Sequence, residues 1–295
     1  MSALTRFASR LLPARADLAA RGLEAQVAAA RYAEGERRRV TVPLLDLTAT
    51  PGHDAERATQ LLHGEAFTVY DEADGFAWGQ SATDHYVGYV DATGLGPPLP
   101  APERTVTALV AHVYPAPDIK RRPLAALPFG ARVAVEAEEG EFARLAEGGF
   151  LPRAALAARS DDFVSAAMRF LGAPYLWGGR SMFGLDCSGL VQLALAAVGT
   201  AAPRDSDMQA ALVGEEPAPD APHERGDLLF WKGHVGIVAG ADMLLHANAR
   251  AMAVTCEPLR PAIARIEAEG GGAVTARRRG ADRRPAWPPC TASIR

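Results

Sequence analysis

The sequence has few cysteines and no long stretch of one chemical character. Its three cysteines lie far apart and form no CxxC pair, so we expect neither a disulfide framework nor a zinc ribbon, and a reducing compartment is favoured. No run approaches the roughly 18 consecutive apolar residues that cross a membrane. The net charge is −4 and basic residues cluster only at 37–39 and 277–284. Neither a membrane nor a nucleic acid is expected as a partner.

The N-terminal residues lack the pattern of an export signal. Arginines at positions 6, 10, 15 and 21 interrupt the first 22 residues, which leaves no apolar stretch of about 7–15 residues. The sequence therefore predicts a cytoplasmic protein.

The chain has 295 residues, about twice a typical domain length. Residues 1–39 are rich in alanine and arginine. Leu18, Leu23, Val27 and Tyr32 are spaced loosely as on one helical face, and the pattern ends near Gly35. We interpret residues 1–39 as an N-terminal helical arm.

Two β-rich segments follow. Residues 40–97 contain the runs VTVPLLDL, EAFTVYDE, FAWGQSA and HYVGYVD between turn residues. Residues 98–157 repeat this texture, with Gly88-Tyr89-Val90 and Gly149-Phe150-Leu151 at matching places. The pattern predicts two tandem copies of one small β-barrel, joined by the proline-rich stretch 96–103.

Residues 158–280 have the pattern of an α+β domain. Helices are predicted in DDFVSAAMRFLG and CSGLVQLALAAVG, and strands in GDLLFWKGHVGIVAG and MLLHANA. Residues 281–295 are predicted to be a disordered tail.

Cys187 is the strongest candidate for a reactive group. It stands where FGLDCSGLVQLALAAVG changes from a turn to a helical pattern, behind Asp186 as a possible cap. The free N–H groups and the dipole of a helix start favour a thiolate, which predicts a lowered thiol pKa and an oxyanion site. Faster alkylation of Cys187 than of Cys256 or Cys290 at neutral pH would support this interpretation. A lone cysteine can also be simply a small buried apolar residue.

His234 and His246 are the best candidates for the base. If a three-residue loop 239–241 joins their strands, 238 pairs with 242, and 234 pairs with 246. Directly opposed residues have Cβ atoms about 4.5–5.5 Å apart, so one imidazole would orient the other. A thiol, a base and an orienting group are what acyl transfer requires. A two-residue loop would instead put the histidines on opposite faces.

A metal site is the other chemical use of these residue types. Cys187, His234, His246 and Cys256 include the ligands that zinc prefers, but their spacing matches no compact motif. We expect no metal and no cofactor.

Five strings in residues 173–249 resemble the NlpC/P60 family of papain-like cysteine peptidases, which act on bacterial peptidoglycan peptides. They are APYLWGGRSMFGLDCSGLVQ, PRDSDMQ, RGDLLFW, GHVGIV and LLHANA, in the family's order. The resemblance implies Cys187 as nucleophile, His234 as base and His246 as the third member of a triad.

The resemblance also implies the substrate contacts. Tyr175 would lie near the oxyanion and Trp177 would form a wall of the cleft. The residues implied to hold the amino end of the substrate, with Ser188 also beside the nucleophile, are Asp186, Ser188, Asp205 and Ser206.

The β-rich segments resemble bacterial SH3 domains, and the whole arrangement is similar to that of cytoplasmic γ-D-glutamyl-L-diamino acid endopeptidases. That similarity implies hydrolysis of short murein peptides with a free N-terminal L-Ala, during peptidoglycan recycling. Tyr86, together with Glu65 or Glu72, would contact the free amine.

Two other functions remain open at this stage. One is an exported endopeptidase or amidase acting on intact murein, and the other is a non-catalytic protein that binds wall fragments. The sequence distinguishes neither lysine from diaminopimelate in the substrate nor one oligomeric state from another.

Overall fold

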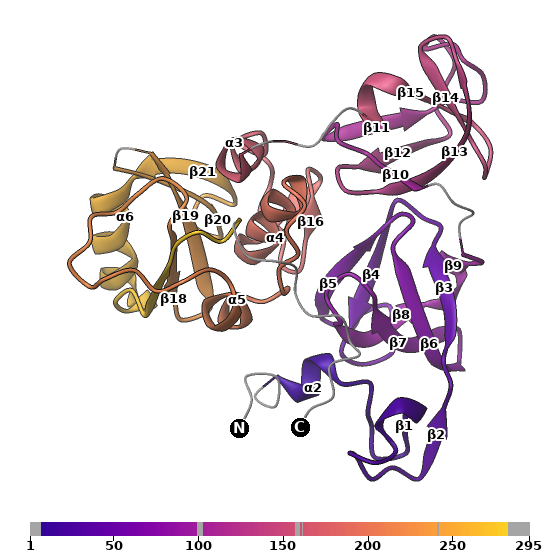
Figure 1. Ribbon diagram of the computed structural model, residues 1–295, viewed down its shortest axis with the longest axis horizontal. Coiled ribbons are helices and arrows are strands. Elements are labelled where there is room, and N and C mark those ends of the chain that lie inside the picture. Colours follow the sequence, from indigo (N-terminus) through magenta and orange to yellow (C-terminus); the bar gives the residue numbers. More distant parts are fainter. Residues whose placement is uncertain (1–6, 99–102, 157–159, 161, 241, 283–295) are drawn as a thin grey trace. The chain divides into compact units, whose positions relative to one another are not determined.

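The computed structural model describes residues 7–98, 103–156, 160, 162–240 and 242–282. The chain forms two compact units, Met1–Ala157 and Ala158–Arg295 (Figure 1). The predicted linker residues 99–102 and the tail residues 283–295 lie outside the described part. Within the rest of the predicted tail, Ala281 is buried.

The predicted N-terminal helical arm is wrong. The segment contains one short helix, two short parallel strands and a 3-10 turn, namely α2 (Ala8–Leu11), β1 (Leu18–Ala20), β2 (Arg31–Ala33) and η1 (Arg21–Leu23). All three residues of β1 are buried, which a one-sided helix would not require. Arg15 also bonds to Asp71 at 2.6 Å and lies 4.4 Å over the Trp78 ring. Packing on the first β module therefore overrides the helical propensity of this segment.

The first β module is one antiparallel sheet in the order β5-β4-β8-β7-β6-β3-β9. Its strands are β3 (Glu36–Val40), β4 (Leu44–Thr48), β5 (Arg57–Leu62), β6 (Ala66–Ala73), β7 (Phe76–Ser81), β8 (Val87–Asp91) and β9 (Leu95–Gly96), with a 3-10 turn η2 (Ala92–Gly94). Within the described residues β5 and β9 do not pair, so the predicted barrel is not closed. Pro97 and Pro98 follow β9 directly, and proline has no N–H to extend a ladder.

The second module has a four-stranded sheet, β10-β13-β14-β15, beside the hairpin β11-β12. The bounds are β10 (Glu103–Thr105), β11 (Val110–Val113), β12 (Ala125–Pro128), β13 (Arg132–Glu139), β14 (Phe142–Leu145), β15 (Phe150–Pro152) and η3 (Arg153–Leu156). In both modules a strand near the end runs directly into a 3-10 turn: β8 leads into η2, and β15 leads into η3. The two β modules share an ion cluster, because Glu147 bonds to His63 and to Arg39, each at 2.7 Å.

The C-terminal unit is an α+β domain, as predicted. Its antiparallel sheet has the order β21-β20-β19-β18-β22. The elements are α3 (Phe163–Met168), β16 (Arg180–Ser181), β17 (Gly184–Leu185), α4 (Cys187–Ala197), α5 (Ser206–Leu212), β18 (Leu228–Trp231), β19 (His234–Gly240), β20 (Met243–Asn248), β21 (Ala253–Pro258), α6 (Leu259–Ile266), η4 (Glu267–Gly271) and β22 (Ala276–Arg278).

The sheet of this unit lies between two helices (Figure 1). Helix α4 packs against β19 and β20, and α6 packs against β20 and β21 on the other side. Helix α4 is almost wholly buried, which explains why its sequence is apolar all round. In the described part of the chain, every helix is too short or too polar to span a bilayer.

Candidate active site

Cys187 is the first residue of α4. The carboxylate of Asp186 caps the helix by accepting a hydrogen bond from the Gly189 N–H at 2.7 Å. A side chain at Gly189 would not fit, because its Cβ would lie 2.4 Å from the carbonyl oxygen of Gly179. The helix start is thus held tightly against the loop that precedes it. This fixes the position of the Cys187 backbone.

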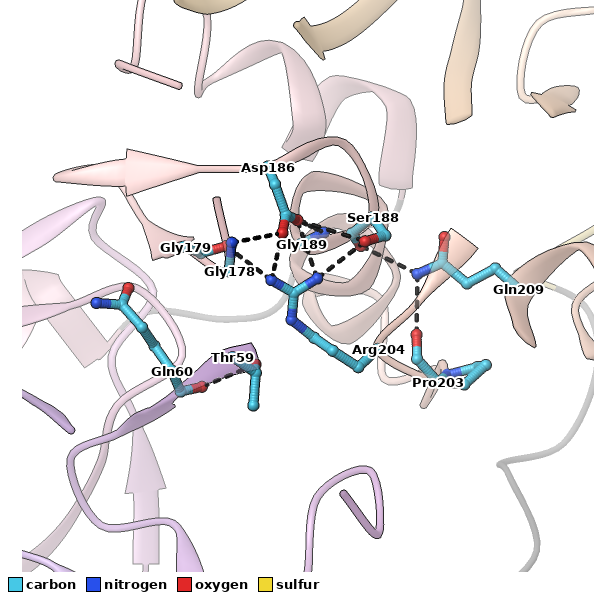
Figure 2. A network of polar contacts seen from close by, with 10 residues as sticks. All are labelled: Thr59, Gln60, Gly178, Gly179, Asp186, Ser188, Gly189, Pro203, Arg204 and Gln209. Carbon is cyan, nitrogen blue, oxygen red and sulfur yellow. Dashed lines mark hydrogen bonds and ion pairs between the residues drawn. The ribbon is translucent and has the colours of Figure 1, made fainter. Parts of the chain in front are cut away.

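Arg204 closes this network from the other side (Figure 2). It is 1% exposed, and its guanidinium donates to both oxygens of Asp186, at 2.9 and 2.6 Å, and to the Ser188 hydroxyl at 2.9 Å. The Gly178 N–H donates to Asp186 as well, at 2.9 Å. Both oxygens of Asp186 therefore have partners inside this unit. A contact of Asp186 or Ser188 with a substrate amine stays a prediction.

The two histidines lie side by side, but by a different register from the one predicted. Gly240 pairs with Met243, so two residues rather than three separate the paired ends of β19 and β20. A β-bulge between Val238 and Gly240 then adds one residue, and Val238 pairs with Leu244. The bulge restores the shared face that a two-residue loop would have destroyed. His234 and His246 are diagonal neighbours rather than a directly opposed pair.

A hydrogen-bonded chain runs through the two imidazoles. Nε2 of His234 lies 2.8 Å from Nδ1 of His246, and Nε2 of His246 lies 2.8 Å from Oε1 of Glu257. The sulfur of Cys187 accepts a hydrogen bond from the N–H of Val235, the residue directly after His234, and another from the N–H of Ser188. The thiol thus lies beside the backbone at the start of β19, next to the residue that carries the first imidazole.

The predicted lowering of the Cys187 pKa is wrong for the free protein. Burial, and next the charge of Asp186, raise the pKa of the thiol from 9.0 to about 12, against the N–H groups of Val235 and Ser188 and the charge of Arg204. A shift of this size corresponds to about 4 kcal/mol. The start of a helix stabilises an anion by only about 0.3–1 kcal/mol, so desolvation prevails.

His234, the candidate base, is neutral as well. Burial, followed by the charges of His246 and Arg265, lowers the pKa of His234 to about 3. Burial also lowers the pKa of His246, although Glu257 opposes the shift. The resting site therefore holds a neutral thiol and two neutral imidazoles at pH 7.

These pKa values predict how Cys187 reacts with iodoacetamide. Because only the thiolate is alkylated, the rate at Cys187 should rise about tenfold per pH unit between roughly pH 7 and 9, with no plateau. Peptide mapping by mass spectrometry separates Cys187 from Cys256 and Cys290. A rate that is already constant at neutral pH would show that the thiolate is preformed.

Tyr175 and Trp177 precede the nucleophile in the chain. Burial, and then the negative charges of Cys187 and Asp186, raise the pKa of the Tyr175 hydroxyl to about 12. The hydroxyl is thus a hydrogen-bond donor near the sulfur, where an oxyanion would form. Trp177 is 58% exposed, and its place in the wall of a cleft stays a prediction.

The other predicted contacts lie in different elements. Asp205 precedes α5 and Ser206 begins it, and both are partly buried. Glu65 and Tyr86 belong to the first unit and are buried, whereas Glu72 pairs with Arg38 at 2.8 Å on the surface. The Glu65 carboxylate accepts from the Thr83 hydroxyl and the Leu62 N–H, each at 2.9 Å. Their contacts with a substrate stay predictions.

Among the described residues, no group of three or more His, Cys, Asp and Glu side chains is arranged to hold a metal ion. Cys256 is partly exposed, next to Glu257 on β21. The four residues considered for zinc do not form such a group.

Sequence reasoning missed Arg204 and Glu257. Arg204 belongs to the PRDSDMQ string, in which the family resemblance points only to Asp205 and Ser206 as substrate contacts. Glu257 could have been found from the register of the β20-β21 hairpin, in which His246 pairs with Thr255. Glu257 lies two residues further on the same face as Thr255.

A thiol at the start of a buried helix, packed on an antiparallel sheet that carries a base and its partner, is the arrangement of papain-like cysteine peptidases. Residues 172–266 match the NlpC/P60 family, and residues 47–95 match the bacterial dipeptidyl-peptidase Sh3 domain. A crystal structure of an NlpC/P60 family protein from Bacillus cereus has a TM-score of 0.69 over 83% of this chain and 100% of that one. At 20% identity it shows a shared fold.

Two relatives with known names are similar to this chain in sequence. The chain is 30% identical over 190 residues to the peptidoglycan endopeptidase RipB of Mycobacterium tuberculosis, covering 59% of this chain and 77% of RipB. It is 41% identical over 96 residues to the gamma-D-glutamyl-L-lysine dipeptidyl-peptidase of Bacillus subtilis. That match spans 30% of this chain and about a third, 32%, of the Bacillus protein. The chain belongs to the NlpC/P60 family, and it combines the NlpC/P60 domain with a bacterial SH3 domain of the dipeptidyl-peptidase type.

Proposed function

We propose that this protein hydrolyses the γ-D-glutamyl–diamino acid bond of short murein peptides that carry a free N-terminal L-Ala, and so releases L-Ala-D-Glu. The observation that carries the proposal is the dipeptidyl-peptidase Sh3 match at residues 47–95, in the same chain as the Cys187–His234–His246 site. The likeness to the gamma-D-glutamyl-L-lysine dipeptidyl-peptidase supports the same substrate class. The proposal also places the protein in the cytoplasm, where it would act on peptides released during recycling of the cell wall.

In the proposed reaction the Cys187 sulfur attacks the γ-carbonyl carbon of D-Glu while His234 takes the thiol proton. The Tyr175 hydroxyl and the backbone N–H at the start of α4 stabilise the oxyanion. Imidazolium of His234 then protonates the leaving amine, which breaks the C–N bond and leaves a thioester. Water attacks the thioester, His234 accepts a proton from it, and the thiol is regenerated with L-Ala-D-Glu.

Selection for a free amine requires a negative or polar pocket. In this proposal Asp205 and Ser206, at the start of α5, supply the acceptors within the catalytic unit. An ammonium bonded to a carboxylate is held by a charge-assisted hydrogen bond, which an acetylated amine cannot make in the same way.

An endopeptidase acting on intact peptidoglycan is the second candidate, because RipB is similar over most of its length. The test compares L-Ala-γ-D-Glu-meso-diaminopimelate, its lysine analogue, their N-acetylated forms and purified sacculi. We expect kcat/KM for the free peptides to exceed that for the acetylated forms at least about 100-fold, because acetylation removes a charged hydrogen bond of the amine. Equal cleavage of the acetylated peptides, or faster release from sacculi, would overturn the free-amine assignment. Cell fractionation checks the location.

A further inference from the structure

Glu257 lies on β21, the strand next to β20, and it follows His234 and His246 in the hydrogen-bonded chain. In the β20-β21 ladder, Leu244 pairs with Glu257 and His246 pairs with Thr255. Glu257 is therefore the diagonal neighbour of His246, just as His246 is the diagonal neighbour of His234. The three side chains thus follow one another across β19, β20 and β21, joined by the two hydrogen bonds.

Arg265 of α6 fixes the role of the Glu257 carboxylate. Its guanidinium donates to Oε1 of Glu257 at 2.6 Å, the same oxygen that lies 2.8 Å from Nε2 of His246. An arginine only donates hydrogen bonds, so this oxygen is an acceptor. Nε2 of His246 must then carry the hydrogen. Arg265 is itself held by Glu269, at 3.3 Å.

The position of the hydrogen on His246 also determines the position of the hydrogen on His234. A neutral imidazole with hydrogen on Nε2 has a lone pair on Nδ1, and Nδ1 of His246 faces Nε2 of His234. Nε2 of His234 is then the donor in that bond. The lone pair of His234 is left on Nδ1, which makes Nδ1 the atom that would accept the thiol proton in the proposed reaction.

We propose that Glu257, held by Arg265, is a positioning residue that sets the tautomer of His246 and, through it, the tautomer of His234. This inference rests on the proposed peptidase function and adds to it. Without Glu257, His246 carries its hydrogen on either nitrogen. The form with hydrogen on Nδ1 turns a donor towards His234 and breaks the chain.

The competing explanation is that Glu257 and Arg265 only attach α6 to β21. Nitrogen NMR of protein labelled with ¹⁵N-histidine separates the two, because protonated and unprotonated ring nitrogens have distinct shifts. All seven histidines are labelled, and His234→Gln and His246→Gln identify the two signals. Wild type should show both rings with hydrogen on Nε2. Glu257→Ala should show His246 as a mixture of tautomers.

The kinetic readout uses the same variants. Glu257→Ala should lower kcat about 10- to 100-fold, the usual cost of losing a partner that orients a functional histidine, with KM changed less than about twofold. Glu257→Gln keeps a carbonyl acceptor, so it should preserve the tautomer and recover part of kcat. The matched control is Glu216→Gln, which changes an exposed acid that pairs with Arg278 at 3.5 Å, and it should leave kcat unchanged.

The proposal is overturned if a folded Glu257→Ala keeps the wild-type kcat, or if its His246 tautomer stays unchanged. Hydrogen exchange of α6 tells whether the helix has detached in that variant. The spectra need no substrate. If wild type has the expected tautomers but cleaves no γ-D-glutamyl peptide, the proposed function fails and the assignment of Glu257 does not.

Discussion

Replacing Cys187 by alanine should reduce hydrolysis of the γ-D-glutamyl peptide at least about 10⁴-fold, the scale seen when an enzyme loses its covalent nucleophile. The Cys187 sulfur is the nucleophile of the proposed reaction, and the two imidazoles, paired with each other at 2.8 Å, cannot form a thioester in its place. Product release is followed by chromatography and mass spectrometry over hours, so that a slow residual rate is detected.

Cys256→Ala is the matched control. Cys256 is also a cysteine without a disulfide, but it is partly exposed on β21, and its loss should leave activity intact. Retained activity in Cys187→Ala would mean that another group attacks the carbonyl. Circular dichroism and hydrogen exchange of both variants check that the domain is folded.

Replacing Arg204 by alanine should destabilise the start of α4 by about 3–5 kcal/mol, the usual cost of removing one partner from a buried ion pair. Asp186 would keep its buried charge without the cation that donates to both of its oxygens. The Arg204 side chain is 1% exposed and that of Asp186 is 11% exposed, so water cannot replace the guanidinium. Because Asp186 caps the helix that begins with Cys187, kcat should fall as well.

Hydrogen exchange of peptides from α4 measures this effect locally, which matters in a chain of two units. Arg204→Lys should be intermediate, since one ammonium cannot span both oxygens. The control is Arg225→Ala, which removes an exposed pair with Asp162, whose side chains are 45% and 37% exposed. The Arg225→Ala substitution should lower the free energy of unfolding by no more than about 1 kcal/mol. Unchanged exchange of α4 in Arg204→Ala would contradict the anchoring role.

The sequence predicted those parts of the catalytic unit that rest on local patterns. The apolar run after Cys187 forms α4, and the strings around His234 and His246 form β19 and β20. The adjacency of the two histidines was also predicted, although by a wrong loop length. A β-bulge leaves no clear mark in the residue pattern, because one extra residue changes the pairing without changing the alternation on either side.

The N-terminal segment and the buried charges could not be predicted in this way. Residues 18–20 are all buried, and nearby Arg15 bonds to Asp71 of the first β module. Such tertiary contacts override a weak helical pattern. Arg204 and Asp186 are 18 residues apart in sequence, so no periodicity links them. The raised pKa of Cys187 follows from the burial of its thiol, whereas a sequence shows only that a helix begins there.

The central claim is that Cys187 forms a thioester with the γ-carboxyl group of D-Glu. Its most direct test mixes the protein with L-Ala-γ-D-Glu-meso-diaminopimelate, quenches the mixture with acid within the first turnover, and maps the peptides by mass spectrometry. We predict a burst of free diaminopimelate and one L-Ala-γ-D-Glu acyl group on the peptide that contains Cys187. Release of diaminopimelate in a full burst, with Cys187 unmodified throughout, would contradict the account.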